Sequence, residues 1–236
     1  KFFVKFKNFM HQRRIEKFRG LWGGIHKLKI FDEIISLENL FLAWREFRRG
    51  KRKKSDVQEF EFNLEDNLFQ LHHELKNKIY QHSDYTTFSI CDPKPRRIHK
   101  ACVRDRVLHH AVFRILYPIF DKSFIFDSYS CRFGKGTHRA INRLERFCDK
   151  SSKNGRQNIF ILKCDVKRFF DSVNQNILLG LIKKKIQDES SIWLIAKIIK
   201  SFEKERASSL PLGNVTSQLF ANIYLNEFDR FVKREL

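Results

Sequence analysis

The sequence predicts an α+β fold that is mostly helical and carries a small antiparallel sheet. Long stretches such as 34–48 and 103–117 place apolar residues at the three- and four-residue spacing of a helix face. Two short runs, 85–90 and 97–102, flank the turn signal Asp92–Pro95 and indicate a β-hairpin. Helices outnumber strands along the chain, so the α+β class is expected, and the length allows one large domain or two small ones.

Helix boundaries follow from local breakers and caps. Gly50 ends the first helix, and Pro118 is expected to stop the third at Tyr117, because a proline ring cannot continue the hydrogen-bond ladder. Thr137 is the expected N-cap of the fourth. Helices are predicted over 34–48, 59–80, 103–117, 138–149, 175–186 and 190–203, with a last one after Asn214.

One apolar run differs from the helical stretches. Residues 158–165 (NIFILKCD) have the length and continuity of a strand buried on both faces, and Asp165 ends it. The polar stretch 151–158 with Gly155 precedes it as a connector. On the last helix, the residues expected to face inward are Leu219, Ile223, Phe228 and Phe231.

The charge balance indicates an anionic partner. Lys and Arg number 47 against 27 acidic residues, a formal net charge of +20 on 236 residues. Such an excess favours nucleic acid, with an anionic membrane surface as the competing partner. No apolar run is long enough to cross a bilayer. The run Lys51–Lys54 is interpreted first as a solvated loop and, as the alternative, as a phosphate contact.

The cysteines exclude two classes of protein. They are five in number and widely spaced, without a C-x-x-C pair, so they form neither a disulfide framework nor a zinc site. A reducing, cytoplasmic location is expected.

Asp165 is the strongest single candidate for chemistry. A carboxylate at the end of a strand is rigid and open to a cleft, which suits Mg²⁺ with its preference for one or two carboxylates and phosphate oxygens. A capping aspartate fits the same position equally well. Asp171 is expected to be such a cap, and Phe170 is either a core aromatic or the wall of a substrate pocket.

The turn at 210–214 is the second candidate. Gly213 allows the backbone to approach a ligand closely, and small polar residues follow on the first turn of a helix, whose free N–H groups attract phosphate. On this segment alone, an ordinary capped helix is the favoured interpretation.

Basic residues mark three further segments. The cations at 94–97 lie on the hairpin, where they suit either a triphosphate or an exposed strand, and Arg104, Asp105 and Arg106 fit surface ion pairs. The segment 132–138 has two glycines and two cations before a helix, but it lacks the spacing of a Walker A loop.

Taken in order, these segments resemble prokaryotic reverse transcriptases related to group II intron enzymes, over roughly 34–236. The resembling segments are 96–111 and 128–141 for the two fingers motifs, 162–171 for palm motif A and 210–226 for motif B. The resemblance implies a right-hand polymerase with fingers over 34–157 and a partial palm over 158–236, after a basic extension over 1–33.

Motif B narrows the resemblance. Most reverse transcriptases carry Gln before the motif glycine and Ser-Pro after it, whereas this chain has Leu212 before Gly213 and Ser217-Gln218 after it. The pattern L-G-x-x-x-S-Q is similar to that of diversity-generating retroelement enzymes, which implies error-prone copying of template adenines and a basic accessory protein. Retron, group II intron and antiphage-defence reverse transcriptases are the alternatives.

The resemblance assigns roles to individual residues. Asp165 and the Val166 carbonyl would bind two catalytic Mg²⁺ ions, and Phe170 would exclude the ribose 2′-hydroxyl. Arg132 and Lys135 would contact template or primer. The incoming dNTP and the templating base would contact Lys94, Arg96, Arg97, Phe170, Leu212, Gly213 and Gln218.

The chain departs from the family in one respect. Two divalent ions about 3.5–4 Å apart need several carboxylates, and the aromatic-x-Asp-Asp hairpin that supplies them in the family is missing from 1–236. This chain alone is therefore expected not to synthesise cDNA, that is, not to extend a DNA or RNA primer along an RNA template. A catalytically dead nucleic-acid-binding remnant is the competing function.

Overall fold

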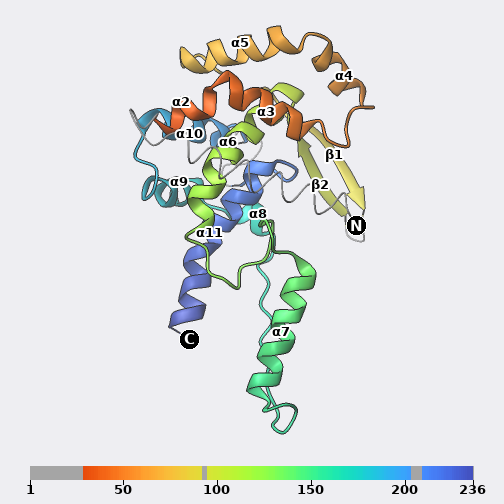
Figure 1. Cartoon of the computed structure of the whole chain (residues 1–236), viewed down its shortest axis with the longest axis vertical. Helices are drawn as coiled ribbons and strands as arrows, with labels where there is room; N and C mark the ends of the chain where they lie inside the picture. The colour runs from red at the N-terminus through yellow and green to blue at the C-terminus, as the bar shows by residue number, and fades with distance from the viewer. Residues whose placement is uncertain (1–28, 92–94, 203–208, 236) are drawn as a thin grey trace.

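The structure is a computed structural model that describes residues 29–91, 95–202 and 209–235. Within these ranges helices dominate and the sheet has two strands, so the mostly helical α+β class with a small antiparallel sheet is confirmed (Figure 1). None of the helices described is both long enough and apolar enough to pass through a bilayer.

The described part begins with two helical pairs in place of two long helices. Ser36 interrupts the expected helix over 34–48: its Oγ accepts a hydrogen bond from the Asn39 N–H at 3.2 Å and caps the second member. Asn63 interrupts the expected helix over 59–80 with φ −113° and ψ 42°. The four helices are α2 (Ile30–Ile35), α3 (Leu37–Phe47), α4 (Ser55–Phe62) and α5 (Leu64–Lys76).

The predicted hairpin is present. Strand β1 (Thr86–Cys91) pairs antiparallel with β2 (Pro95–Lys100), in a register that places Phe88 opposite Ile98. Residues 92–94, including Lys94, lie outside the described ranges. Because successive side chains of a strand alternate between its faces, Phe88, Ile98 and Lys100 share one face of the hairpin, and Arg97 belongs to the other.

Helix α6 (Val103–Asp121) is the central element and contacts α2, α3, α4, α5 and α11 (Figure 1). It continues through Pro118, so the expected stop at Tyr117 is wrong. A proline costs the helix one hydrogen bond, but the extra turn places Phe120 in the core at 2% exposure. Burial of that ring offsets the lost bond.

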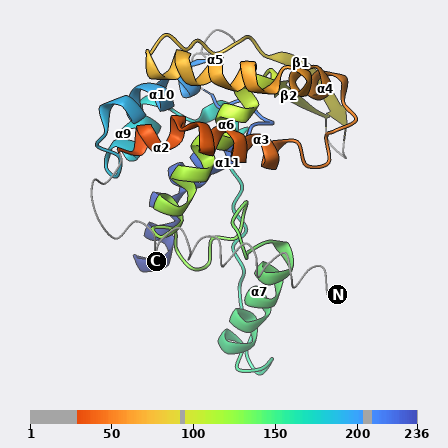
Figure 2. The same cartoon turned by 45° about the horizontal axis from the view of Figure 1, so that its top comes forward.

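Helix α7 (Thr137–Ser151) stands apart from the helical body in both views (Figures 1 and 2). None of its residues is buried, although Ile141, Leu144 and Phe147 form an apolar stripe. Thr137 is the first helical residue and makes no capping bond; the N-cap position belongs to Gly136 with φ +116°.

The expected strand over 158–165 is wrong in this structure. Residues 158–166 carry no regular secondary structure, and Phe160 and Leu162 are 101% and 88% exposed. A strand is stabilised by hydrogen bonds to a neighbouring strand. In the described residues the sheet consists of β1 and β2 alone, so this apolar segment has no strand partner there.

The C-terminal helices are α8 (Phe169–Ser172), α9 (Gln175–Lys183), α10 (Glu189–Lys200) and α11 (Val215–Arg234). Asp188 joins α10 to α2: its carboxylate accepts from the Ser191 hydroxyl at 2.7 Å and from the Phe31 N–H at 2.9 Å. On α11 the inward orientation holds for the two residues nearer its N-terminus, but Phe228 and Phe231 are 54% and 49% exposed.

One apolar core joins the two parts of the chain. Buried side chains of α2, α3, α5 and α6 form a common cluster with those of α9, α10 and α11. Residues on either side of position 157 therefore share an interior, and the division into fingers and partial palm remains a prediction.

Candidate functional site

The turn before α11 lies directly against the hairpin. The His99 N–H donates to the Leu212 carbonyl at 2.9 Å. At Gly213, φ is +117°, and a Cβ added there would come within 3.0 Å of the Ile98 methyl carbon Cγ2 and 3.4 Å of the His99 carbonyl. Glycine is therefore required twice, for the backbone conformation and for the close approach.

The same turn is tied to the segment that follows Asp165. The Leu210 N–H donates to the Phe170 carbonyl at 2.8 Å. Beside it, the Gln175 side-chain amide donates to the Ser209 carbonyl at 2.9 Å. Three segments singled out in the sequence, at 96–100, 165–171 and 210–218, thus meet around one turn.

Asp165 itself is exposed, at the end of the extended segment 158–166, and Val166 beside it is 54% exposed. The described residues contain no group of three or more His, Cys, Asp or Glu side chains placed to hold a metal. One carboxylate suits a single Mg²⁺ that also binds substrate oxygens, but it does not form a two-ion site. These residues therefore do not fit a two-metal centre by themselves.

Phe170 is half-buried and contacts Phe169 edge-to-face, with ring centroids 5.5 Å apart. It packs against the apolar core, as expected if Phe170 is a core aromatic residue. Its role beside a sugar remains a prediction.

A cavity of about 360 Å³ opens between the hairpin, the α3–α4 connector, α6 and the start of α11. Gly213 and Gln218, both expected to shape a nucleotide pocket, line it; Leu212, Phe170 and Asp165 do not. Four cationic side chains line the same cavity: Lys51, Lys54, Lys100 and Arg106. The cavity is thus a basic one, and the sequence motifs supply only part of its wall.

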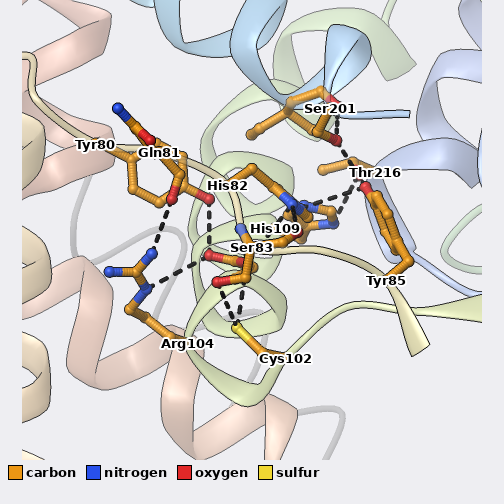
Figure 3. A network of polar contacts seen from close by, with 12 residues as sticks. Tyr80, Gln81, His82, Ser83, Tyr85, Cys102, Arg104, His109, Ser201 and Thr216 are labelled. Atoms are coloured by element: carbon orange, nitrogen blue, oxygen red, sulfur yellow. Dashed lines mark hydrogen bonds and ion pairs between the residues drawn. The ribbon is translucent and has the colours of Figure 1, made fainter. Parts of the chain in front are cut away.

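A buried polar network (Figure 3) includes His109, one of the residues that line the cavity. The Asp105 carboxylate, with no solvent exposure, accepts from the Tyr80 hydroxyl at 2.8 Å and from the Ser83 N–H at 2.8 Å. The Cys102 thiol donates to it at 3.2 Å. Burial by itself raises the pKa of Asp105, but the His82 ring and these hydrogen bonds lower it below the ordinary value of 3.8. The expectation of a surface ion pair for Asp105 is therefore wrong.

Two histidines extend the network to α11 (Figure 3). His82 Nδ1 donates to the Ser83 carbonyl, which can only accept, at 2.6 Å. His109 Nε2 lies 3.1 Å from His82 Nε2. On its other side, His109 Nδ1 lies 3.1 Å from the Thr216 hydroxyl.

The pKa of His109 indicates a neutral ring. Burial, followed by the neighbouring His82, lowers the pKa of His109 from 6.5 to about 3, so the ring is neutral at pH 7. A neutral ring has one donor and one acceptor, which the two bonds use. The first turn of α11 is therefore held by a chain of hydrogen bonds that begins in the segment 80–85.

The fingers residues expected to contact nucleic acid have different surroundings. The guanidinium of Arg132 binds the Asp121 carboxylate at 2.7 Å and the carbonyls of Ile125 and Ser128 at 2.8 and 3.0 Å, and its side chain is 7% exposed. Lys135 donates to the Phe126 carbonyl at 2.6 Å and covers that ring. Both residues organise their loop, and their contact with template or primer remains a prediction.

The hairpin arginines are exposed, and Arg96 and Arg97 belong to opposite faces of β2. A ligand on one face of the hairpin is therefore reached by one of them. The contact of Arg96 with a triphosphate remains a prediction, and its predicted companion Lys94 lies outside the described residues.

Sequence reasoning missed the network and most of the basic cavity. A signal for the network was present: Asp105 and His109 lie four residues apart on the apolar stripe of a helix, where polar residues need buried partners. No comparable signal brings Lys51 next to Arg106, because their proximity depends on the packing of α3 against α6.

The chain is similar to known proteins over about half of its length. No model of a protein family matches the chain. Protein YkfC of Escherichia coli is 31% identical over 137 residues, which are 55% of this chain and 35% of YkfC. Group II intron-encoded protein LtrA of Lactococcus lactis subsp. cremoris is 33% identical over 134 residues, which are 54% of this chain and 21% of LtrA.

A solved structure shares the fold. A chain of the partial Cas6-RT-Cas1–Cas2 complex matches with a TM-score of 0.54 at 18% identity, over 88% of this chain and 35% of that one. The chain spans only about a fifth to a third of the length of the relatives named above. Over about half of its length the chain is therefore similar to YkfC and to a group II intron-encoded protein, and it shares the fold of a chain in that complex.

Proposed function

We propose that this chain supplies the fingers and part of the palm of an RNA-directed DNA polymerase. The observation that carries the proposal is the convergence of three segments on one turn, through the bonds from His99 to Leu212 and from Leu210 to Phe170. Template-directed transfer needs a template, an incoming nucleotide and a metal ligand close together. The hairpin, the turn before α11 and the segment after Asp165 are the elements that would hold them.

The relatives support the same function. LtrA is a group II intron-encoded protein, and the structural neighbour belongs to a Cas6-RT-Cas1–Cas2 complex. The net charge of +20 suits RNA and DNA partners. Two Mg²⁺ ions would bind Asp165 together with further carboxylates of the complete protein, because one carboxylate does not hold both.

The test is primer extension by the complete protein that contains these residues, with an RNA template, dNTPs and Mg²⁺. Asp165→Asn should lower the rate by more than about a hundredfold. A residue that only forms a hydrogen bond to a metal ligand costs at most about that factor when it is replaced, so a larger loss indicates a metal ligand. The matched control is Asp149→Asn, an exposed carboxylate on α7, which should leave the rate unchanged. A complete protein that binds RNA but never extends a primer would instead be a binding-only protein.

We further propose error-prone copying of the kind implied by Leu212-Gly213 and Ser217-Gln218. Gln218 lines the basic cavity at the first turn of α11, where a change of side chain alters the space beside a templating base. Replacing Leu212 with Gln and Gln218 with Pro restores the more common motif. Sequencing of the cDNA should then show fewer substitutions opposite template adenines, and an unchanged error spectrum would contradict this part of the proposal.

A further inference from the structure

The two buried histidines connect the base of the hairpin to the start of α11 (Figure 3). Tyr85, the residue before β1, stacks on the His82 ring with centroids 4.9 Å apart, and its hydroxyl lies 3.3 Å from His82 Nε2. The same nitrogen lies 3.1 Å from His109 Nε2. On the far side of His109, Nδ1 lies 3.1 Å from the hydroxyl of Thr216, in the first turn of α11. Two side chains therefore join two elements that both line the basic cavity.

The first turn of α11 lacks the usual means of fixing a helix start. Asn214 precedes the helix but makes no hydrogen bond as a side-chain cap, although residues of this type commonly cap helices. Thr216 is 1% exposed and bonds to α6 through His109 instead.

This contact controls the side of the helix that faces the cavity. Gln218, which lines the cavity, follows Thr216 by two positions. At 3.6 residues per turn, two such residues lie on nearly opposite sides of a helix. Holding Thr216 against His109 therefore sets the direction in which Gln218 points.

His109 and Thr216 form a polar contact between two helices that also pack through apolar side chains. Leu108 of α6 and Leu219 of α11 belong to the same core cluster. His109 is only 1% exposed, and burial of polar groups costs free energy that apolar side chains of similar size avoid. A hydrogen bond has a preferred distance and direction, whereas apolar contacts tolerate several arrangements. The polar contact thus contributes a defined position more than it contributes stability.

We propose that His109 is a positioning residue of the polymerase site: supported by His82 at the base of the hairpin, it fixes the first turn of α11. This inference rests on the proposed function, in which Gln218 and the turn at Gly213 lie beside the templating base. His109 acts through Thr216 and takes no part in the chemistry. A displacement of about 1 Å in such a site lowers a rate by up to a hundredfold, even when the replaced residue is far from the reacting atoms.

The first experiment compares two replacements of Thr216 in the complete protein that contains these residues. Thr216→Val keeps the branched shape of the side chain and removes the hydroxyl, whereas Thr216→Ser keeps the hydroxyl. Thr216→Val should lower kcat/KM for dNTP in primer extension by about tenfold to a hundredfold, and Thr216→Ser should stay close to wild type. Both should bind primed RNA template as wild type does, because phosphate contacts dominate that affinity.

The second experiment separates position from stability. His109→Leu with Thr216→Val replaces both polar partners by apolar side chains, a change that is close to neutral for folding. The unfolding midpoint in urea should therefore stay near wild type, while kcat/KM falls as it does in Thr216→Val. The matched control is Ser191→Ala, which removes a buried hydroxyl that donates to Asp188 at 2.7 Å on α10. This control should lower the urea midpoint and leave kcat/KM unchanged.

Hydrogen exchange gives a readout that does not depend on catalysis. In the 236-residue chain, the backbone amides of residues 215–220 should exchange faster in Thr216→Val than in wild type, because the first turn of α11 opens more easily. Thr216→Ser should retain the wild-type exchange rates. Unchanged exchange in Thr216→Val would show that the contact does not hold the turn, and would overturn the inference.

Two activity results would also overturn it. Thr216→Val with the wild-type kcat/KM would show that the site does not depend on this contact. A loss in Ser191→Ala as large as in Thr216→Val would reduce the effect to general destabilisation. A complete wild-type protein that never extends a primer would overturn the proposed function and the role at a polymerase site with it, whereas the exchange rates would still decide whether His109 holds the turn.

Discussion

Asp105 is a carboxylate enclosed by the protein, and its neighbours explain why it is charged. Hydrogen bonds from Tyr80, Ser83 and Cys102 replace the water that it loses. Removing a charge from such a site leaves donors that face no acceptor, and this costs more than the bond itself contributes.

We therefore expect Asp105→Asn to lower the free energy of unfolding by about 3 kcal/mol. The new amide NH₂ would face the Ser83 N–H, donor against donor. Urea denaturation followed by circular dichroism measures the change. Asp66→Asn, the same replacement at an exposed position of α5, should cost less than about 0.5 kcal/mol. Equal costs at the two sites would show that Asp105 is not held as described.

His109 should make stability depend on pH. The folded ring stays neutral down to its pKa of about 3, whereas the unfolded ring takes up a proton below about 6.5. The unfolded state binds more protons in that window, so stability falls as pH falls from about 6.5 to about 3. His109 contributes about 1.4 kcal/mol per pH unit to this slope.

The measurement is the unfolding free energy at several pH values in that window. His109→Gln should lower the slope, whatever it does to stability at pH 7. His138→Gln, at an exposed position of α7, serves as the control and should retain the wild-type slope. An unchanged slope in His109→Gln would contradict the buried neutral ring.

Gly213 and Gly136 allow two reasons for glycine to be compared: a positive φ, and a lack of space for a Cβ atom. Both have φ near +117°, at +117° and +116°, but a Cβ meets Ile98 only at Gly213 and finds open space at Gly136. Gly136→Ala should show the backbone strain alone, of about 1–3 kcal/mol, and Gly213→Ala should cost about 1–3 kcal/mol more. Thermal unfolding of both variants provides the comparison. Similar costs would mean that the hairpin moves aside easily.

At the scale of elements, the extended segment 158–166 shows the limit of a pattern. Its apolar composition indicates a strand, but hydrogen bonds with another strand decide whether the strand forms. Without such a partner among the described residues, its side chains face solvent. The amphipathic helices need no such partner for their backbone, since each forms its own hydrogen bonds.

Two leucine variants test this difference. Leu108→Ala, in the core part of α6, should cost about 2–5 kcal/mol of unfolding free energy. The same replacement at Leu162, which is 88% exposed, should cost less than about 0.5 kcal/mol in this chain. Urea denaturation measures both. A large cost at Leu162 would place that segment inside a packed interior.

Element boundaries were predicted less well than the elements themselves. The hairpin follows from its turn signal, and the structure shows that Asn174 and Asp188 cap the two short helices that follow them. No glycine or proline marks the helix breaks at Ser36 and Asn63. The helical spacing of apolar residues continues through both breaks, so the sequence predicts one long helix in each place. Pro118 does not end α6, because the helix gains stability when Phe120, two residues further on, becomes buried in the core. Local sequence rules do not include this tertiary contribution.

At the scale of the whole molecule, the count of metal ligands limits activity. Asp165 is the one carboxylate that the resemblance assigns to metal, the described residues hold no group of three or more metal-ligand side chains, and two Mg²⁺ ions need more carboxylates. We expect the 236-residue chain, with Mg²⁺, dNTPs and a primed RNA template, to give no primer extension. Gel analysis with a known polymerase as positive control is sufficient. Extension that depends on Asp165 would contradict this expectation.

The sequence by itself determined the helical class, the hairpin, the glycine turn before α11 and the basic character of the chain. Each depends on local backbone preference or on composition, which a linear pattern contains. The tertiary structure alone decided that β2 lies against that turn, that Asp105 and His109 are buried partners, and that Lys51 joins Arg106 in one cavity. The physical reason is that these contacts join residues about 25 to 115 positions apart, and their energies depend on packing and desolvation rather than on neighbours in sequence.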